Sequence, residues 1–423
     1  MAKEIGEKSN LLNTAELREY YSNTPLLFRN LALIATCNVG WSIALGITSP
    51  LMLLRLLDVG VSEGYQATVG SVNLALLSFL VMYFSWKSDH TVSKIGRRKP
   101  FLFLAAGPII LSTALFPLVA SPVPLVGLWL MKILFGNIKA STFPLLSIDC
   151  VRRDMLARGQ SILQVVNGAV MFLAMRSAAS LVDIGEWVPF AFGAIVLCIS
   201  TIAAWFIKEP PISNPAQGPF KPWSALQVGM KDRRIIWLML GVSMTASFES
   251  IFMSWNWIYA KTNLNLERAD IFESLSWAQL VSLAVAFPTG WLIDKVGGFK
   301  VIVIYYALML INFIFLLKVH DAGSLAIYFS VMIIANPLNN AADIMVYKAA
   351  DPKDVGSFTS SNAFIRNLYN GTLLLFSGWF IEITNRNYHA LFFIGVILMT
   401  FGMIMFLIYR AKMRSSTHAS QSR

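Results

Sequence analysis

Charged residues are scarce in this sequence, as are the residues that usually build metal centres and disulfide frameworks. Only 13% of its 423 residues are Asp, Glu, Lys or Arg, about half the share in an average soluble domain. The three cysteines are scattered, and none of the four histidines is in a pair. We therefore expect no disulfide framework, no metal site and no bound cofactor.

Motifs for ATP hydrolysis and nucleophilic catalysis are also missing. No Gly-rich phosphate loop follows a strand pattern, and no Ser/His/Asp arrangement is recognisable, so we do not expect an enzyme. The net charge of +11 would suit nucleic-acid binding. However, the basic residues concentrate in alternate short loops between apolar runs, which is the charge pattern of membrane topology. We therefore expect the lipid bilayer as a partner, and no nucleic acid.

Long apolar runs dominate what is present, since 56% of the residues are hydrophobic. Runs of about twenty apolar residues are typical of membrane-spanning helices. The polar start of the chain lacks the apolar core of a signal peptide. Twelve spans are predicted, at 27–50, 65–86, 101–120, 124–148, 160–182, 187–207, 234–260, 270–293, 300–318, 323–348, 357–382 and 389–410.

The spans predict two six-helix bundles joined by a polar linker that contains five prolines. The expected organisation is an N-terminal tail at 1–25, a bundle at 26–207, a linker at 208–232, a bundle at 233–410 and a tail at 411–423. An even number of spans places both tails in the cytoplasm, and the basic, serine-rich second tail is expected to be disordered. We expect a monomer in an inner or plasma membrane.

One turn occurs twice, about 205 residues apart. The stretch SWKSDHTVSKIGRRKPF begins at Ser85, between two apolar runs, and GWLIDKVGGFK begins at Gly290 in the same setting. Ser85 and Asp89 have the same spacing as Gly290 and Asp294. Repetition of a basic turn at equivalent places suggests two related halves around a midplane site.

The paired turn resembles the loops between helices 2 and 3, and between helices 8 and 9, of the major facilitator superfamily. SDHTVSKIGRRKPF is closest to the glycoside–pentoside–hexuronide:cation symporters and the plant sucrose carriers, although Ser85 replaces the usual Gly and His90 the usual Arg. The resemblance implies an all-α fold of twelve helices, alternating access, and a conformational latch. The latch residues would be Asp89, Arg97, Arg98 and Asp294; the simpler alternative for the arginines is topogenic charge.

Three ionisable residues fall within predicted spans, and two of them, Lys139 and Glu249, lie near the middle. Lys132 and Lys139 lie seven residues apart on one face of the fourth span. Glu249 lies at the centre of the seventh. A buried charge needs a partner, water or a ligand. We assign the lysines to substrate binding and Glu249 to proton coupling; the alternatives are snorkelling for Lys132 and a salt bridge between Glu249 and Lys139.

Uncharged polar residues form stripes on several spans. One face of the tenth span carries Asn336, Asn340 and Asp343, and one face of the eleventh carries Asn362 and Arg366. Asp343 is a second proton-coupling candidate, or the partner of Arg366 in a static ion pair. The remaining substrate-binding candidates are Asn38, Trp41, Gln164, Asn167 and Asn256, which could equally act as interhelical hydrogen-bonding groups.

The resemblance implies a secondary transporter whose small-molecule substrate is a sugar or a glycoside, and the excess of basic over acidic residues within the spans suggests a sugar acid. A polar cavity with aromatic residues suits such a substrate. The resemblance suggests a proton or sodium as the coupling ion. The acidic residues of the bacterial sodium site are missing from the second and fourth spans, so we favour a proton over sodium, and an uncoupled facilitator stays open. The alternatives are an exporter of organic anions or amphipathic compounds on the same fold, and a non-transporting sensor or assembly factor.

Overall fold

The structure, a computed structural model, describes residues 18–91, 93–150, 156–211, 233–349 and 355–421. Helices make up these segments, which contain no strand, and each of the twelve predicted spans coincides with helix. Nine of the described helices are long and apolar enough to cross a membrane. The first six spans are α2 (Thr24–Asp58), α3 (Glu63–Asp89), α4 (Lys99–Leu115) with the short η1 (Phe116–Leu118), α5 (Pro122–Asp149), α6 (Leu156–Ile184) and α7 (Val188–Trp205).

The seventh span is interrupted where the sequence predicted a continuous helix. It consists of α9 (Arg233–Thr245) and α10 (Ser247–Thr262), separated at Ala246. The hydroxyl groups of Thr245 and Ser247 donate to the carbonyls of Gly241 and Met244. Such back-bonding competes with the helical ladder and favours a bend at this point, where no proline is present.

The remaining spans are α11 (Arg268–Val296), α12 (Gly298–Leu316), α13 (Ala322–Ala349), α14 (Val355–Ile383) and α15 (Tyr388–Gln421). The last helix continues to Gln421, well beyond the predicted span end at residue 410. Residues 411–421, predicted to belong to a disordered tail, therefore extend this helix. The predicted linker lies largely outside the described residues.

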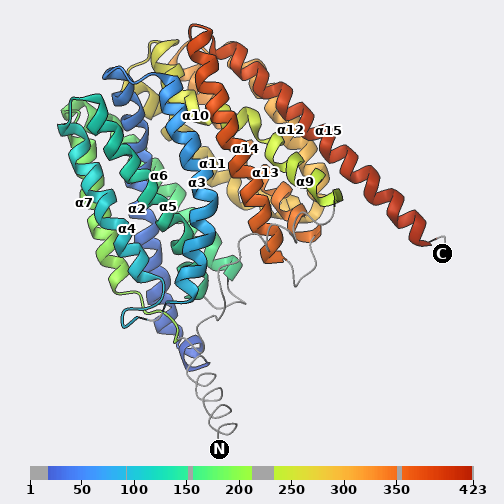
Figure 1. The fold of residues 1–423 in the computed structure, drawn as a ribbon, viewed down its shortest axis with the longest axis horizontal. Coiled ribbons are helices and arrows are strands. Elements are labelled where there is room, and N and C mark those ends of the chain that lie inside the picture. Colours follow the sequence, from blue (N-terminus) through green and yellow to red (C-terminus); the bar gives the residue numbers. More distant parts are fainter. Residues whose placement is uncertain (1–17, 92, 151–155, 212–232, 350–354, 422–423) are drawn as a thin grey trace, which may run out of the picture. The chain divides into compact units, whose positions relative to one another are not determined.

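Contacts divide the chain into two compact units (Figure 1). The first contains residues 1–49, 80–174 and 184–220, and α4 packs between α5 and α7 in it. Its core includes Ile34, Trp41, Leu102 and Leu197. Apolar side chains from several helices thus meet in one interior, as in other helix bundles.

The second unit contains residues 50–79, 175–183 and 221–423. Here α15 packs against α9 and α10, and α13 contacts both α11 and α12. Phe252 lies at the centre of an aromatic cluster with ring centroids 4.5 Å from Tyr328, 5.6 Å from Phe329 and 5.3 Å from Phe392. Two further helices, α13 and α15, are thereby held to α10 by rings in edge or tilted contact.

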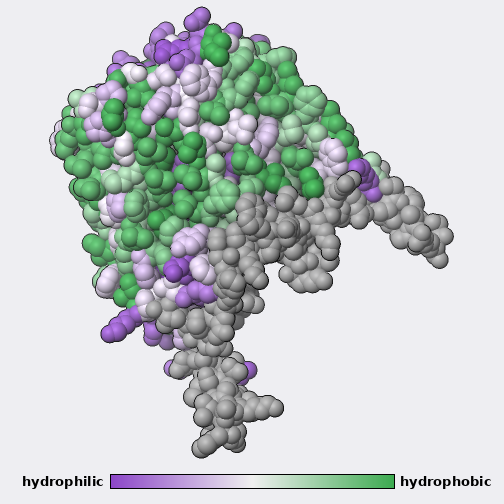
Figure 2. Space-filling model, in the orientation of Figure 1, coloured by the Kyte–Doolittle hydropathy of each residue, from purple (hydrophilic) through white to green (hydrophobic). Residues whose placement is uncertain are grey.

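The helix surfaces suit a lipid environment. Figure 2 shows hydrophobic residues along the sides of the helices and hydrophilic residues gathered towards their ends. Large side chains such as Leu104, Ile199 and Ile314 are exposed on three different helices. In water such faces would promote aggregation, whereas in a bilayer they contact lipid chains.

Candidate functional site

Lys132 is buried in the first unit beside α2. Its ammonium group donates to Thr48 Oγ1 at 2.7 Å and to Ser49 Oγ at 3.3 Å, and the residue is only 4% exposed. Gly193 lets α7 approach α2 at this level, since a Cβ there would lie 2.8 Å from the Thr48 methyl group. Lys132 therefore points inward to hydroxyl groups and does not snorkel along a lipid-facing surface.

Lys139 lies two turns further along α5, between two aromatic rings. Its ammonium is 5.2 Å from the centroid of Trp41 and 4.9 Å from that of Phe143. No carboxylate of the described residues forms an ion pair with it. Aromatic faces attract a cation but do not neutralise it. Lys139 therefore places its ammonium group beside the faces of two aromatic rings.

Other predicted binding residues of the first unit are dispersed. Asn38 is half-buried on α2, close in sequence to the buried Trp41. Asn167, on α6, has a buried side-chain oxygen without a hydrogen-bond partner among the described residues. Gln164 belongs to α6, and its side chain lies outside the described part of the structure. Of the candidates described in this unit, Trp41 and Lys139 are brought into direct contact.

A polar cavity of about 190 Å³ lies in the second unit, between α3, α10 and α14. Its polar lining comes from Ser250, Ser254, Asn370 and Ser377. Trp255 donates its indole N–H to Ser377 Oγ at 2.8 Å. The Asn370 side-chain oxygen is buried without a described hydrogen-bond partner, so an acceptor lines the cavity with its bonding capacity unused. Sequence reasoning missed these residues, because single serines are common in helices.

Glu249 lies in the first turn of α10, directly after the interruption of the seventh span. Tyr305 of α12 donates its phenol O–H to the Glu249 carboxylate at 2.8 Å. Phe252 and Asn256, three and seven residues after Glu249 on the same helix, are buried, as is Thr245 before the interruption. The carboxylate is thus held inside the second unit. The tyrosine was missed because sequence spacing on one helix says nothing about the facing helix.

The other candidates of the second unit are only partly described. Asn256 and Asn362 are buried, and Arg366 is half-buried on α14. The side chains of Asn336, Asn340 and Asp343 on α13, and of Asp294 on α11, lie outside the described residues. The pairing of Asp343 with Arg366 therefore stays a prediction.

The basic turn between α3 and α4 is held by an ionic network. Arg98, whose side chain is 4% exposed, binds Asp89 at 2.6 Å and Asp149 at 3.2 Å, and also donates to Ser88 Oγ. Arg97 binds Asp149 at 2.5 Å. The predicted latch residues Asp89, Arg97 and Arg98 therefore come together. Charge-assisted bonds of this kind fix the geometry of a turn.

Two carboxylates complete this network and were absent from the predicted site. Asp149 ends α5, and Glu209 accepts the backbone N–H groups of Arg97 at 2.8 Å and Lys99 at 3.0 Å. Glu209 therefore caps the N-terminus of α4, where an anion is favoured by the helix dipole. Gly96 has φ +121° and leaves no room for a side chain against Glu209. The available signal was Lys208-Glu209-Pro210 at the end of the sixth span.

A second hydrogen-bonded cluster fixes the end of α7. Tyr20 donates its O–H to the Lys208 carbonyl at 2.7 Å, and Asn30 Nδ2 donates to the same oxygen at 2.8 Å. The Lys208 backbone N–H donates to Asn30 Oδ1 at 3.1 Å. Burial raises the pKa of the neighbouring Cys150 thiol to about 12, so this cysteine is a protonated, structural residue.

Ion pairs in the second unit join segments that are distant in sequence. Asp58 at the end of α2 binds both Lys261 and Arg268, the latter at 2.5 Å. Glu63 at the start of α3 binds Arg386 at 2.7 Å. The end of α2 is therefore tied to the end of α10 and the start of α11, and the start of α3 to the segment that follows α14.

Comparison with known proteins gives one family and several structural relatives. Residues 31–368 match the family described as the Major Facilitator Superfamily. The nucleoside transporter NupG, solved as a point mutant, superposes with a TM-score of 0.68 at 12% identity, over 91% of this chain and 99% of that one. The comparison with curated sequences found no match.

Two further solved structures have the same fold. A bacterial homologue of the human lysosomal transporter Spinster, in an inward-facing and occupied conformation, gives a TM-score of 0.66 at 13% identity, over 92% of this chain and 97% of that one. An auto-inhibited peptide transporter of the POT family gives a TM-score of 0.65 at 11% identity, over 91% of this chain and 97% of that one. At such identities the likeness is one of fold, with twelve helices in two six-helix bundles.

Proposed function

This chain belongs to the major facilitator superfamily, and we propose that it is a proton-coupled secondary transporter of a sugar, a glycoside or a sugar acid. Its apolar helices make it an integral membrane protein, and the fold it shares with nucleoside and peptide transporters is one of secondary transport. Substrate would cross by alternating access. Among the three substrate classes, the sugar acid has the most support.

Lys139 is the observation that carries this choice. An ammonium group buried in hydrocarbon is costly unless a countercharge or water compensates it. Lys139 has two aromatic rings beside it and no ion-pair partner among the described carboxylates. A carboxylate on the substrate would supply the missing charge. Trp41 and Phe143 would face the apolar surface of a pyranose ring.

The second unit has a polar cavity of its own, and the chemistry of its lining suits hydroxyl groups. Its serine hydroxyls and the Asn370 amide offer both donors and acceptors. The unused acceptor of Asn370 would take a hydrogen bond from a substrate hydroxyl. A purely apolar substrate would leave the Asn370 oxygen buried and unpaired, at a cost in affinity.

Uptake into proteoliposomes tests the substrate class. We expect radiolabelled sugar acids to accumulate above neutral sugars, and unlabelled sugar acid to compete. Accumulation of neutral sugars alone would contradict the anionic substrate. Transport restricted to unrelated organic anions would contradict the whole proposal and favour the organic-anion exporter. Protease protection of terminal tags tests the proposed cytoplasmic location of both termini. Light scattering of the purified protein tests whether it is a monomer.

Glu249 is the proposed proton carrier, and Glu249→Gln should abolish substrate-driven proton uptake. Glutamine retains an acceptor for the Tyr305 hydroxyl but cannot release a proton at physiological pH. Counterflow, in which labelled and unlabelled substrate exchange, should persist, because it requires no net proton movement. Proton uptake is measured with a pH-sensitive dye inside the liposomes.

Glu273→Gln is the matched control, since Glu273 is an exposed carboxylate paired with Arg176. This variant should retain proton uptake. Proton uptake that persists unchanged in Glu249→Gln would remove Glu249 from the coupling mechanism and leave Asp343 as the remaining candidate.

A further inference from the structure

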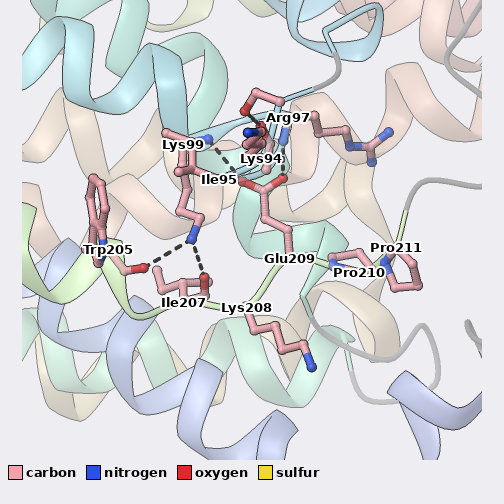
Figure 3. A pocket seen from close by; sticks show the side chains of 12 residues that line it. Lys94, Ile95, Arg97, Lys99, Trp205, Ile207, Lys208, Glu209, Pro210 and Pro211 are labelled. Carbon is pink, nitrogen blue, oxygen red and sulfur yellow. Dashed lines mark hydrogen bonds between the residues drawn. The ribbon is translucent and has the colours of Figure 1, made fainter.

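A basic cavity opens at the start of α4 and the end of α7 in the first unit (Figure 3). Its volume is about 470 Å³. Four cationic side chains line it, against a single carboxylate, and they come from Lys94, Arg97, Lys99 and Lys208. The cavity is separate from the residues proposed to bind substrate, none of which lines it.

The single carboxylate is already engaged with backbone groups. In Figure 3, Glu209 points towards the first turn of α4, where its oxygens accept the N–H groups of Arg97 and Lys99. The Lys99 ammonium turns to the carbonyls of Trp205 at 3.1 Å and Ile207 at 2.7 Å. Arg97 binds Asp149. Glu209 is therefore bound to the N-terminus of α4 and Asp149 to the arginines, so neither carboxylate neutralises the lysines of the cavity.

Lys94 and Lys208 have no countercharge among the residues that the structure describes. Both are exposed, and neither ammonium has a hydrogen bond or ion pair within the segments that the structure describes. The Lys208 backbone is fixed at both its N–H and its carbonyl, whereas its side chain points away from Glu209 (Figure 3). Two lysines with unused charge thus flank one cavity.

The cavity lies where two membrane-spanning helices end. α4 begins at Lys99 and α7 ends at Trp205. Trp205 and Phe206 are 56% and 62% exposed, and Phe103 of α4 packs against the Trp205 ring at 5.1 Å between centroids. Exposed aromatic rings beside lysines are typical of the level of lipid headgroups. An occupant would therefore have both an anionic head and an apolar part.

We propose that this cavity binds the phosphate headgroup of an anionic phospholipid. Lys94 and Lys208 would contact the phosphate, and the rings of Trp205 and Phe206 would contact the first part of the acyl chains. Basic pockets at the ends of membrane helices hold anionic headgroups in this way. Arg97 and Glu209 belong to the ionic network between α3 and α4, so a lipid bound here would stabilise that turn.

Binding is tested with the full-length protein in detergent, titrated with phosphatidylglycerol, phosphatidylcholine and free inorganic phosphate. Melting temperature and native mass spectrometry report binding. We expect phosphatidylglycerol alone to raise the melting temperature and to remain bound in the mass spectrum. The apparent affinity for phosphatidylglycerol should fall about tenfold in Lys94→Gln/Lys208→Gln, because each lysine near an anionic headgroup adds to the electrostatic attraction.

The matched control is Lys87→Gln/Lys300→Gln, which removes two exposed lysines outside the cavity. This variant should bind phosphatidylglycerol like the parent protein. Equal weakening in both double variants would overturn the proposal, because the effect would then be one of net charge. Equal binding of phosphatidylcholine would overturn it as well. Binding of inorganic phosphate with the same affinity, lost in the cavity variant, would replace the lipid by a soluble phosphate.

Discussion

Lys139→Met is expected to lower substrate uptake by about tenfold to a hundredfold while leaving the melting temperature unchanged or slightly higher. A hydrogen bond to a charged group contributes about 1.5–3 kcal/mol, so loss of the ammonium should weaken an anionic substrate by that factor. Methionine fills a similar volume between Trp41 and Phe143 and removes a charge that is costly to bury. Substrate uptake should therefore fall while thermal stability is kept or slightly raised.

Radiotracer uptake and thermal unfolding of the same preparation measure the two effects. Lys139→Arg is the matched variant: it keeps the charge and should retain part of the uptake. Lys87→Met removes an exposed lysine at the end of α3 and should change neither quantity. A melting temperature that falls by several degrees in Lys139→Met, with normal uptake, would assign Lys139 to a structural ion pair and contradict the substrate-binding role.

Arg98→Leu should produce the largest loss of stability of any single change in the first unit. Its guanidinium is buried and holds Asp89, Asp149 and Ser88 together. Removal of one partner from a buried charged network costs about 3–5 kcal/mol. We expect the melting temperature to fall by roughly 10 °C, with uptake lost in parallel. Thermal unfolding in detergent provides the measurement.

Arg97→Leu is the natural comparison because Arg97 contacts the same Asp149 from a more exposed position, 24% against 4% for the Arg98 side chain. Exposed ion pairs contribute little, so this loss should be a few degrees at most. Arg98→Lys should rescue only partly, since an ammonium cannot replace the planar fork of a guanidinium. Equal small losses in both leucine variants would mean that the arginines are topogenic charge only.

The helices were predictable because hydrocarbon imposes a simple rule on the chain. Each span must be long, apolar and helical, and nine of the described helices meet this requirement. The break at Ala246 was not predictable, because it depends on the hydroxyls of Thr245 and Ser247 and on close packing by Gly402. A side chain at Gly402 would approach the Thr245 nitrogen to 2.5 Å. The helix propensities of the residues around Ala246 carry no information about a contact with a distant helix.

The candidate site was predictable only one helix at a time. Periodicity placed Lys132 and Lys139 on one face of α5, and the structure places both inward. It could not reveal that Tyr305 bonds Glu249, or that Asp149 and Glu209 complete the network around Arg98, because each contact joins residues from different helices. The resemblance to known turns supplied Asp89, Arg97 and Arg98.

The ion pairs of Asp58 and Glu63 have a consequence for biosynthesis. Their partners Lys261, Arg268 and Arg386 follow 203 to 323 residues later in the chain. At about 5–20 residues per second, a ribosome needs at least roughly ten seconds to deliver the first partner. Both carboxylates lie at helix ends, where water solvates them during this interval. The early helices can therefore insert into the bilayer before the later helices are synthesised and form these ion pairs.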